Sequence, residues 1–347
     1  MDGNAARTPS RLTGRKKFLF GGIAGIAIIL LLAVVSEVVL RAVGIGPWTK
    51  QKTTIRVEPG GTFFAPHPAL GYTHIAGTFR VTLPDGYAFG VTHLPSTLRV
   101  THPIATYDST RPKDEIWIFG CSFTHGWALD DEDTYAWRLQ ERFPGFEVVN
   151  FGTNGYGTLH SLIQFRDALQ HKKPRVAVLA YASFHDARNT FLRKRQKAVA
   201  TWNSLGPLVQ PYAQLESDGT LRIEMADVEY REFPLMRRSA LAHFIEMTYN
   251  NYEAWRTPSD RVTEALISEM AAVANANGVR FVVAFIAGNP YMTTFTRAAG
   301  IPTVDISVDL TLPEHNNEPH DNHPSALAAR KYADALDTFL RGDLASQ

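Results

Sequence analysis

The sequence predicts a protein of the α/β class, in which a parallel sheet is covered on both faces by helices. From residue 113 onward, short apolar runs typical of buried strands alternate with segments typical of helices. The chain has 347 residues, of which 45% are hydrophobic and 20% are charged. This composition can fill a large core, and it excludes a chain that is disordered throughout.

A membrane anchor is the first expected element. Residues 18–35 carry no charge, and as a helix they reach about 27 Å, close to the hydrocarbon thickness of a bilayer. The run is long for a cleaved signal peptide, and no good cleavage site follows it. We therefore expect a basic cytoplasmic tail at 1–17 and an uncleaved transmembrane signal anchor at 18–43. The rest of the chain is then extracytoplasmic, on the periplasmic or cell-surface side. The alternative is a buried helix of the globular part.

Two further regions follow the anchor. Residues 44–112 are rich in Gly, Pro, Thr and aromatic residues, which predicts a small β-rich segment with strands near 78–83 and 97–100. Residues 113–342 form the expected α/β domain. Residues 187–237 interrupt its alternation as an insertion, and the turn Ser217-Asp218-Gly219 within it predicts a hairpin.

The α/β domain is expected to contain strands and helices in alternation. The expected strands are residues 115–119, 147–151, 175–181, 279–286 and 302–306. The expected helices are residues 134–143, 159–169, 240–255, 259–277 and 325–340.

Charge and cysteine content exclude several classes of function and kinds of site. Lys and Arg number 35 against 34 Asp and Glu, a formal net charge of +1, which argues against a dedicated nucleic-acid binder. The single cysteine, Cys121, excludes an internal disulfide and a cysteine zinc site. His320 and His323 have metal-ligand spacing, but no further ligand set completes them. No metal and no other cofactor is expected.

The loops after the expected strands carry the candidate chemistry, because ligands bind beyond the carboxyl ends of the strands in an open α/β sheet. Ser122 directly follows the first strand, where a tight turn at Gly120 can expose its hydroxyl. His323 precedes the last helix and can act as the base that activates such a serine. Asp321 can orient that histidine. The backbone N–H groups of Ser122 and Gly155 are candidate donors to a developing oxyanion.

Three blocks of this chain resemble those of the SGNH (GDSL) hydrolase superfamily. Their order and strand context agree with that superfamily over about residues 113–342. The blocks are Gly120-x-Ser122-Phe123-Thr124-x-Gly126, Asn150 to Thr158 with Gly155 five residues after the asparagine, and Asp321-x-His323-Pro324.

The resemblance implies a flavodoxin-like three-layer α/β/α fold and the chemistry of a serine esterase, lipase or acyltransferase. It implies Ser122 as nucleophile and His323 as base. It also implies that Asn150 supports the active-site loops and that Gly155 serves the oxyanion hole. An acyl ester is the implied substrate, carried by a cell-surface glycan or lipid as one option.

The chain departs from the superfamily pattern at three places. Cys121 replaces the usual Asp of the first block, and a cysteine nucleophile there is a minor alternative to Ser122. His185 stands before Asp186 where an Asn is usual, so the His185 ring is the expected third oxyanion donor and Asp186 a supporting residue. The triad acid usually lies three residues before the histidine, where this chain has His320. We therefore assign Asp321 as the acid, with Asp305 and Glu318 as substitutes.

Several functions stay open at this point. The first is a membrane-anchored extracytoplasmic serine esterase that forms an acyl-enzyme. The second is an O-acyltransferase that passes the acyl group to a surface glycan or lipid. The third is a non-catalytic module that binds a glycan in the same cleft. The nucleophile elbow of α/β-hydrolases fits less well, because Thr124 stands where its second glycine belongs.

Overall fold

The computed structural model describes residues 14–50, 55–106 and 113–345. Two compact units divide the chain. One comprises Met1–Lys50 with Arg231–Tyr252, and the other comprises Gln51–Tyr230 with Glu253–Gln347. The second unit holds the sheet and the candidate site. Residues 1–13 of the expected basic tail and residues 107–112 at the expected domain boundary lie outside the described residues.

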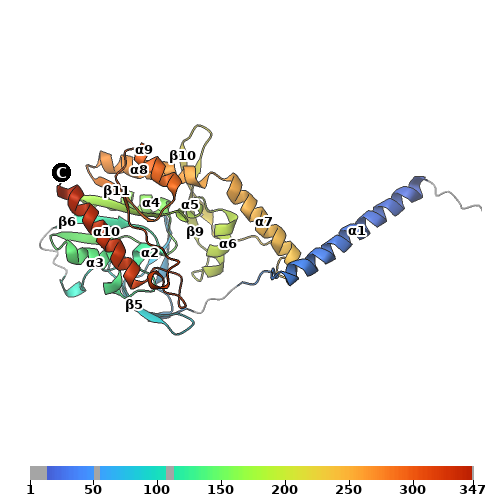
Figure 1. The fold of residues 1–347 in the computed structure, drawn as a ribbon, viewed down its shortest axis with the longest axis horizontal. Helices are drawn as coiled ribbons and strands as arrows, with labels where there is room; N and C mark the ends of the chain where they lie inside the picture. The colour runs from blue at the N-terminus through green and yellow to red at the C-terminus, as the bar shows by residue number, and fades with distance from the viewer. Residues whose placement is uncertain (1–13, 51–54, 107–112, 346–347) are drawn as a thin grey trace, which may run out of the picture. The chain divides into compact units, whose positions relative to one another are not determined.

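A five-stranded parallel sheet forms the centre of the second unit (Figure 1). Its spatial order is β12-β11-β8-β6-β7. Numbered in chain order, the five strands lie in the flavodoxin-like order 2-1-3-4-5. The direction in which successive strands are added to the sheet changes between β6 and β8. Its strands are β6 (Asp114–Phe119), β7 (Phe146–Asn150), β8 (Val176–Ala182), β11 (Arg280–Ala287) and β12 (Thr303–Asp305). The α/β class predicted from the sequence is confirmed.

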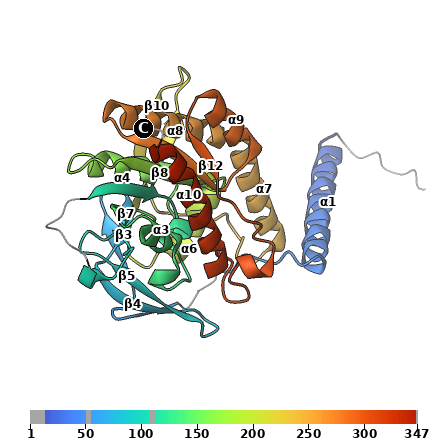
Figure 2. The same cartoon turned by 60° about the vertical axis from the view of Figure 1, so that its left-hand side comes forward.

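Helices cover both faces of this sheet because their apolar sides complete two separate cores. The helices α3 (Tyr135–Arg142) and α10 (Ala326–Ala345) pack against each other over one face, and they lie side by side in Figure 2. The helices α4 (Thr158–Ala168) and α8 (Ser259–Ala276) cover the other face. The middle strand β8 is buried along its whole length, as its apolar sequence predicts.

The β-rich segment forms two small antiparallel sheets. One sheet has the order β1-β4-β5, and β2 pairs with β3 in the other. The strands are β1 (Arg56–Glu58), β2 (Phe64–His67), β3 (Gly71–His74), β4 (Gly77–Thr82) and β5 (Ala88–His93). The strand expected at 97–100 is not formed. Arg99 alone in this stretch makes single bridges, to His93 and to Asn150, because residues 94–98 form a turn.

The insertion holds two helices and a hairpin. The helices are α5 (His185–Asn189) and α6 (Arg193–Trp202), and the hairpin strands are β9 (Val209–Leu215) and β10 (Leu221–Asp227). Gly219 in the hairpin turn has a positive φ of 86°, which glycine adopts without strain. The short elements elsewhere are α2 (Ser122–His125), α9 (Pro290–Ala298) and the 3₁₀ turns Ile104–Thr106, Asp131–Asp133 and Pro313–His315.

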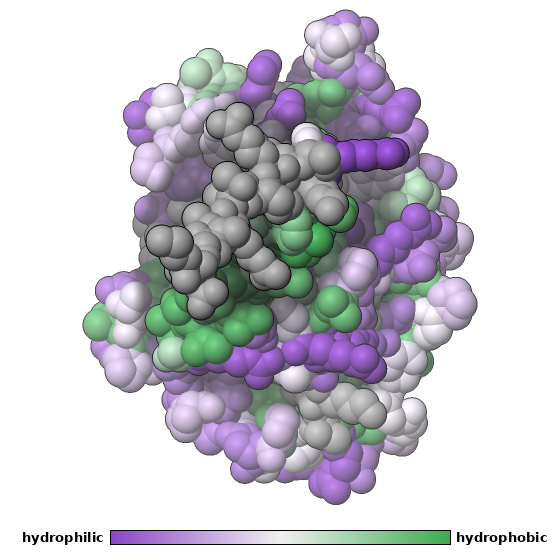
Figure 3. Space-filling model, turned by 90° about the vertical axis from the view of Figure 1, so that its right-hand side faces the viewer, coloured by the Kyte–Doolittle hydropathy of each residue, from purple (hydrophilic) through white to green (hydrophobic). Residues whose placement is uncertain are grey.

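The first unit is built from α1 (Gly14–Ala42) and most of α7 (Ala240–Arg256). The part of α7 up to Tyr252 belongs to this unit. Within α1, the 25 residues Phe18–Ala42 are long and apolar enough to cross a membrane, and none of the most apolar window is buried. Figure 3 shows hydrophobic side chains exposed at several places among hydrophilic ones on this face.

One acidic side chain joins these two helices. Glu37 near the end of α1 accepts hydrogen bonds from the Ala240 and Leu241 N–H groups, both at 2.9 Å, and from the Ser239 hydroxyl at 2.8 Å. The first backbone N–H groups of a helix have no partner inside the helix. Glu37 therefore caps the N-terminus of α7.

Candidate active site

The nucleophile candidate lies on a short helix that begins where β6 ends. Helix α2 starts at Ser122 and ends at His125, and Gly126 closes it with a positive φ of 79° and an N–H bond to the Ser122 carbonyl. Space around this turn is tight. A side chain at Gly120 would overlap Thr124, and one at Gly152 would come within 2.7 Å of the Thr124 backbone. The glycines of the sequence motifs therefore let the loops after β6 and β7 touch.

The structure brings Ser122 and His323 together although 201 positions separate them. The His323 Nε2 atom lies 2.9 Å from the Ser122 Oγ atom. The Nδ1 atom of the same ring is hydrogen-bonded to the Asp321 carboxylate. A carboxylate only accepts, so Nδ1 carries the proton and Nε2 is free to accept the hydroxyl proton of Ser122.

Asp321 is held at both carboxylate oxygens. Its Oδ1 accepts from the His323 ring and from the His323 backbone N–H at 2.8 Å. Its Oδ2 accepts from the Trp127 indole N–H at 3.0 Å. Burial alone would raise the pKa of Asp321, but the hydrogen bonds and charge of His323 and the bond from Trp127 outweigh it, so the pKa is lowered. Asp321 is therefore ionised at neutral pH.

The substitute acids lie elsewhere. Asp305 is exposed and accepts from the Ser307 N–H at 2.9 Å, and Glu318 is also exposed. The His320 ring stacks on Tyr87 and binds Asp85. Of the three acids considered in the sequence, only Asp321 contacts His323 within the described residues.

The candidate oxyanion donors Ser122, Gly155 and His185 are not linked to one another by hydrogen bonds among the described residues. Within the described part of the chain, the N–H groups of Ser122 and Gly155 have no backbone acceptor, as a role in binding an oxyanion requires. Gly155 has a positive φ of 81°, and a side chain there would overlap the Tyr72 hydroxyl. Its carbonyl accepts from Arg195 Nη2 at 2.6 Å.

His185 and Asp186 lie at the end of β8. The His185 ring is fully buried against Tyr181 and Phe184, and neither ring nitrogen has a partner among the described residues. Burial, followed by the charge of Arg188, lowers the pKa of His185 well below its usual value. Asp186 accepts from the Tyr181 hydroxyl at 3.0 Å, and burial raises its pKa to about 6. No hydrogen bond joins either residue to Ser122 within the described chain.

Asn150 lies at the end of β7, as expected for a supporting residue. Its Nδ2 donates to the Thr124 carbonyl at 2.9 Å, and its Oδ1 accepts from the Gly152 N–H at 2.9 Å. Asn150 thus connects helix α2, which begins with Ser122, to the loop that follows β7. Cys121 is fully buried, and among the described residues the His323 ring is hydrogen-bonded to Ser122 and not to Cys121, which disfavours Cys121 as the nucleophile.

Two residues of this region are missed by sequence reasoning. Trp127 binds Asp321, and its only sequence signal is its place directly after the Gly126 of the first block. Arg99 is fully buried and donates to the carbonyls of His125 and Gly126 at 2.9 and 2.6 Å. Arg99 also pairs with Asp131 at 3.1 Å, so Asp131 serves as its counter-charge.

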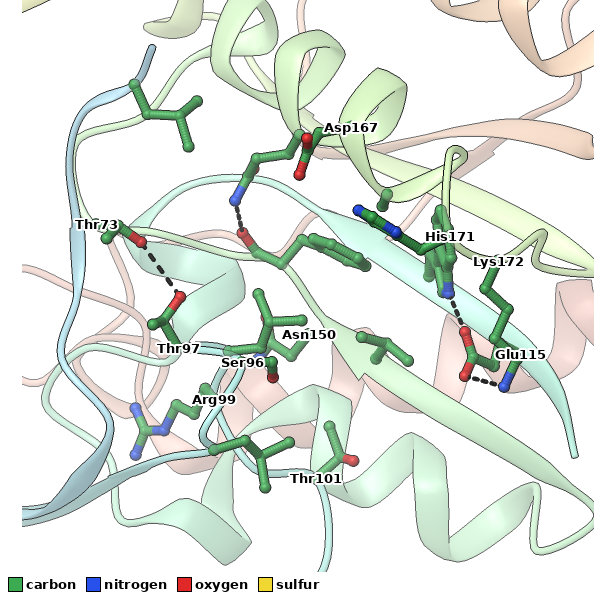
Figure 4. Close-up of a pocket in the computed structure, with 18 of the residues that line it drawn as sticks. Thr73, Ser96, Thr97, Arg99, Thr101, Glu115, Asn150, Asp167, His171 and Lys172 are labelled. Atoms are coloured by element: carbon green, nitrogen blue, oxygen red, sulfur yellow. Dashed lines mark hydrogen bonds and ion pairs between the residues drawn. The ribbon is translucent and has the colours of Figure 1, made fainter. Parts of the chain in front are cut away.

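A separate groove of about 630 Å³ lies beside the edge strand β7. Figure 4 shows the Thr73 and Thr97 hydroxyls, 3.3 Å apart, at one side of it, and the Glu115–Lys172 ion pair at the other. Its lining includes neither Ser122 nor His323. The groove is therefore distinct from the candidate active site.

No protein-family model matches this chain, and no curated protein matches it. The chain is similar to several solved structures. One is TesA, with 14% identity, 66% of this chain and 99% of that chain covered, and a TM-score of 0.40. A second is the psychrotrophic esterase EstA from Pseudoalteromonas sp., with 10% identity, 67% and 100% covered, and a TM-score of 0.38. A third is a member of the lipolytic protein G-D-S-L family from Veillonella parvula, with 10% identity, 65% and 98% covered, and a TM-score of 0.37. At these identities and scores, the function has to be argued from the side chains of this chain itself.

Proposed function

We propose that this chain is a membrane-anchored serine esterase of the SGNH type, acting on acyl esters on the extracytoplasmic side. The observation that carries the proposal is the continuous chain of contacts from Ser122 through His323 to Asp321. A serine hydroxyl becomes a useful nucleophile when a base of fixed tautomer takes its proton. A non-catalytic binding module has no need of this arrangement.

The proposed reaction has two halves. Ser122 Oγ attacks the ester carbonyl carbon while its proton moves to His323 Nε2. The carbonyl oxygen becomes an oxyanion, for which the N–H groups of Ser122 and Gly155 are the proposed donors. The C–O bond to the alcohol then breaks, and His323 returns the proton to the departing alcohol. Asp321 stays ionised and stabilises the imidazolium between these transfers.

The second half resolves the acyl-enzyme. Water gives its proton to His323 Nε2 and attacks the acyl carbon, and Ser122 leaves with the proton that His323 returns. A sugar or lipid hydroxyl in place of water makes the chain an O-acyltransferase. The two outcomes differ only in the acceptor, so product analysis with and without a polyol acceptor separates them.

Labelling with a fluorophosphonate tests the proposal on the full-length chain in detergent. We expect one adduct, located on Ser122 by mass spectrometry. Ser122→Ala removes the adduct and lowers ester hydrolysis by about a thousandfold or more. Ser217→Ala, in the exposed hairpin turn, is the matched control and keeps both. A folded wild-type chain that neither labels nor hydrolyses short acyl esters contradicts the proposal.

A further inference from the structure

Three histidines from separate elements meet in the core of the second unit, outside the proposed catalytic contacts. His74 ends β3, His93 ends β5, and His125 ends α2. All three are buried, with exposed fractions of 2%, 2% and 0%. One nitrogen from each ring lies within 4.8 Å of the other two. The rings of His74 and His93 stack with centroids 4.2 Å apart.

The hydrogen bonds of this cluster set the direction of the lone pairs. The His93 Nδ1 atom lies 3.1 Å from the Ile75 carbonyl. A carbonyl only accepts, so Nδ1 carries the proton and the lone pair of Nε2 points inward. That Nε2 lies 3.0 Å from the His125 Nε2 atom. A backbone carbonyl on the outer nitrogen is the usual arrangement for a metal-bound histidine.

Two nitrogens of the cluster lack partners. The His74 Nε2 and His125 Nδ1 atoms are buried with no hydrogen-bond partner in the described chain. Each buried polar atom left in this way costs about 1–3 kcal/mol. The contact between His93 and His125 therefore leaves two polar atoms of the cluster unsatisfied. A bound ion takes one nitrogen from each ring, so an ion at the His125 Nε2 atom would leave His125 Nδ1 without a partner.

We propose that His74, His93 and His125 bind one divalent late transition-metal ion, with Zn²⁺ as the representative. Imidazole nitrogens suit such ions, whereas Mg²⁺ and Ca²⁺ prefer oxygen ligands. Tetrahedral Zn²⁺ places its nitrogen ligands about 3.3 Å apart, given Zn–N bonds of about 2.0–2.1 Å. The observed separations run from 3.0 Å up to 4.8 Å, and the stacked rings of His74 and His93 have to tilt before both lone pairs point at one ion.

A charged group lies close to the cluster. The Arg99 guanidinium is fully buried and donates to the His125 carbonyl at 2.9 Å, so it opposes a cation at this site. Its ion pair with Asp131 offsets part of that repulsion.

The consequence of binding follows from where the three ligands lie. His74 and His93 belong to the β-rich segment, whereas His125 lies one turn after Ser122 on α2. A bound ion cross-links that segment to the helix that carries the proposed nucleophile. The metal then has a structural role, and His125 acts as a positioning residue for Ser122.

The test uses the full-length chain in detergent, purified with an affinity tag that contains no histidine. After equilibration with Zn²⁺ and dialysis, we expect one zinc per chain by elemental analysis. Co²⁺ in its place should give the intense visible bands of tetrahedral cobalt. Zinc should raise Tm by several degrees relative to the chelator-treated chain, because it binds the folded state only.

Matched variants locate the site. His93→Gln and His74→Gln should each lose the stoichiometric zinc and the zinc-dependent rise in Tm. His171→Gln, an exposed histidine outside the cluster, should keep both. If a cluster variant does not fold, the wild-type result decides. A wild-type chain that retains no zinc, shows no cobalt bands and gains no Tm overturns the proposal and leaves a purely hydrogen-bonded cluster. Phosphonate labelling of the zinc-free chain is scored separately, so failure here is distinct from failure of the esterase proposal.

Discussion

Trp127 has the most specific role among the single residues that sequence reasoning missed. The centroid of its ring lies 5.2 Å from that of the Phe89 ring, and its indole N–H donates to the Asp321 Oδ2 atom at 3.0 Å. The residue therefore links the core of the β-rich segment to the acid of the proposed triad. Phenylalanine at this position keeps an aromatic ring in the core and removes the donor, together with part of the buried ring volume.

We expect Trp127→Phe to lower kcat by about tenfold, the usual worth of a hydrogen bond to a charged group. KM should change little, whereas Tm should fall because the smaller ring leaves a cavity in the core. Loss of the donor also removes one of the interactions that lower the pKa of Asp321. An unchanged kcat would show that the indole bond is only structural.

Asp186 predicts a pH-dependent stability. Burial raises its pKa from 3.8 to about 6, so the folded state binds more protons than the unfolded chain between these values. Folding stability at this residue is therefore present at low pH and is lost as pH rises from about 4 to about 6. Asp186→Asn keeps the shape without the charge. Its Tm should exceed that of the wild type at about pH 7.5 but not at about pH 4.5.

The control for this experiment has the opposite shift. Asp218 in the hairpin turn has a lowered pKa because the Thr220 backbone N–H, followed by its side chain, hydrogen-bonds the carboxylate. Asp218→Asn should therefore give no gain in Tm at the higher pH. A gain in both variants would point to general charge repulsion rather than to the burial of Asp186.

How much of the site is predictable depends on the range of each contact. Ser122, Asp321 and His323 can be singled out because each lies in a short motif of characteristic chemistry, although their roles still await the labelling experiment. The bond from Trp127 to Asp321 joins positions 194 apart and has no local pattern. For the same reason, the histidine cluster is invisible in the sequence, where no metal is expected.

At the scale of elements, close contact between the turns after β6 and β7 places the proposed nucleophile. The Gly152 Cα lies against the backbone of α2 with no room for a methyl group. Both turns lie beside the point where the strand order reverses, which is where ligands bind in sheets of this topology. The position of the site therefore follows from the topology of the sheet. The close approach of the two turns, which places Ser122, depends on the glycines.

Gly152→Ala should destabilise the chain by about 1–3 kcal/mol, the usual cost of overpacking, and should also reduce phosphonate labelling. Gly145 has no atoms within 4 Å of an added methyl group. Gly145→Ala is therefore the matched control, for which we expect an unchanged or slightly raised Tm. Thermal unfolding of the two variants measures the difference. Equal Tm values would mean that the turn relaxes freely.

The elements themselves were predictable where burial is continuous. All five strands of the parallel sheet occur within a few residues of their expected positions, because apolar β-runs report burial on both faces. Helix α9 was not predicted. Its signals are local, namely the Asn289 cap and Pro290 in the first turn. The strand expected at 97–100 is not formed, because residues 94–98 make a tight turn in which the Leu94 N–H donates to the Leu98 carbonyl.

At the scale of the whole molecule, the N-terminal helix predicts the cellular behaviour. The full-length chain should remain in the membrane fraction after alkaline extraction, because an apolar helix of this length is stable in a bilayer. Its intact mass should show no cleavage. A C-terminal alkaline phosphatase fusion should be active, and a green fluorescent protein fusion dark, if the catalytic unit is extracytoplasmic. A shorter soluble product would identify the helix as a cleaved signal peptide.

The contact of Glu37 with the start of α7 bears on how a soluble fragment should be designed. A fragment that begins after residue 42 discards the carboxylate and leaves the Ala240 and Leu241 amides to water, so the first turn of α7 should fray. A fragment that begins just before Glu37 removes most of the greasy run yet retains the cap. The same holds for proteolytic cleavage within the span. A cut before Glu37 keeps the cap of α7, whereas a cut after Glu37 removes it.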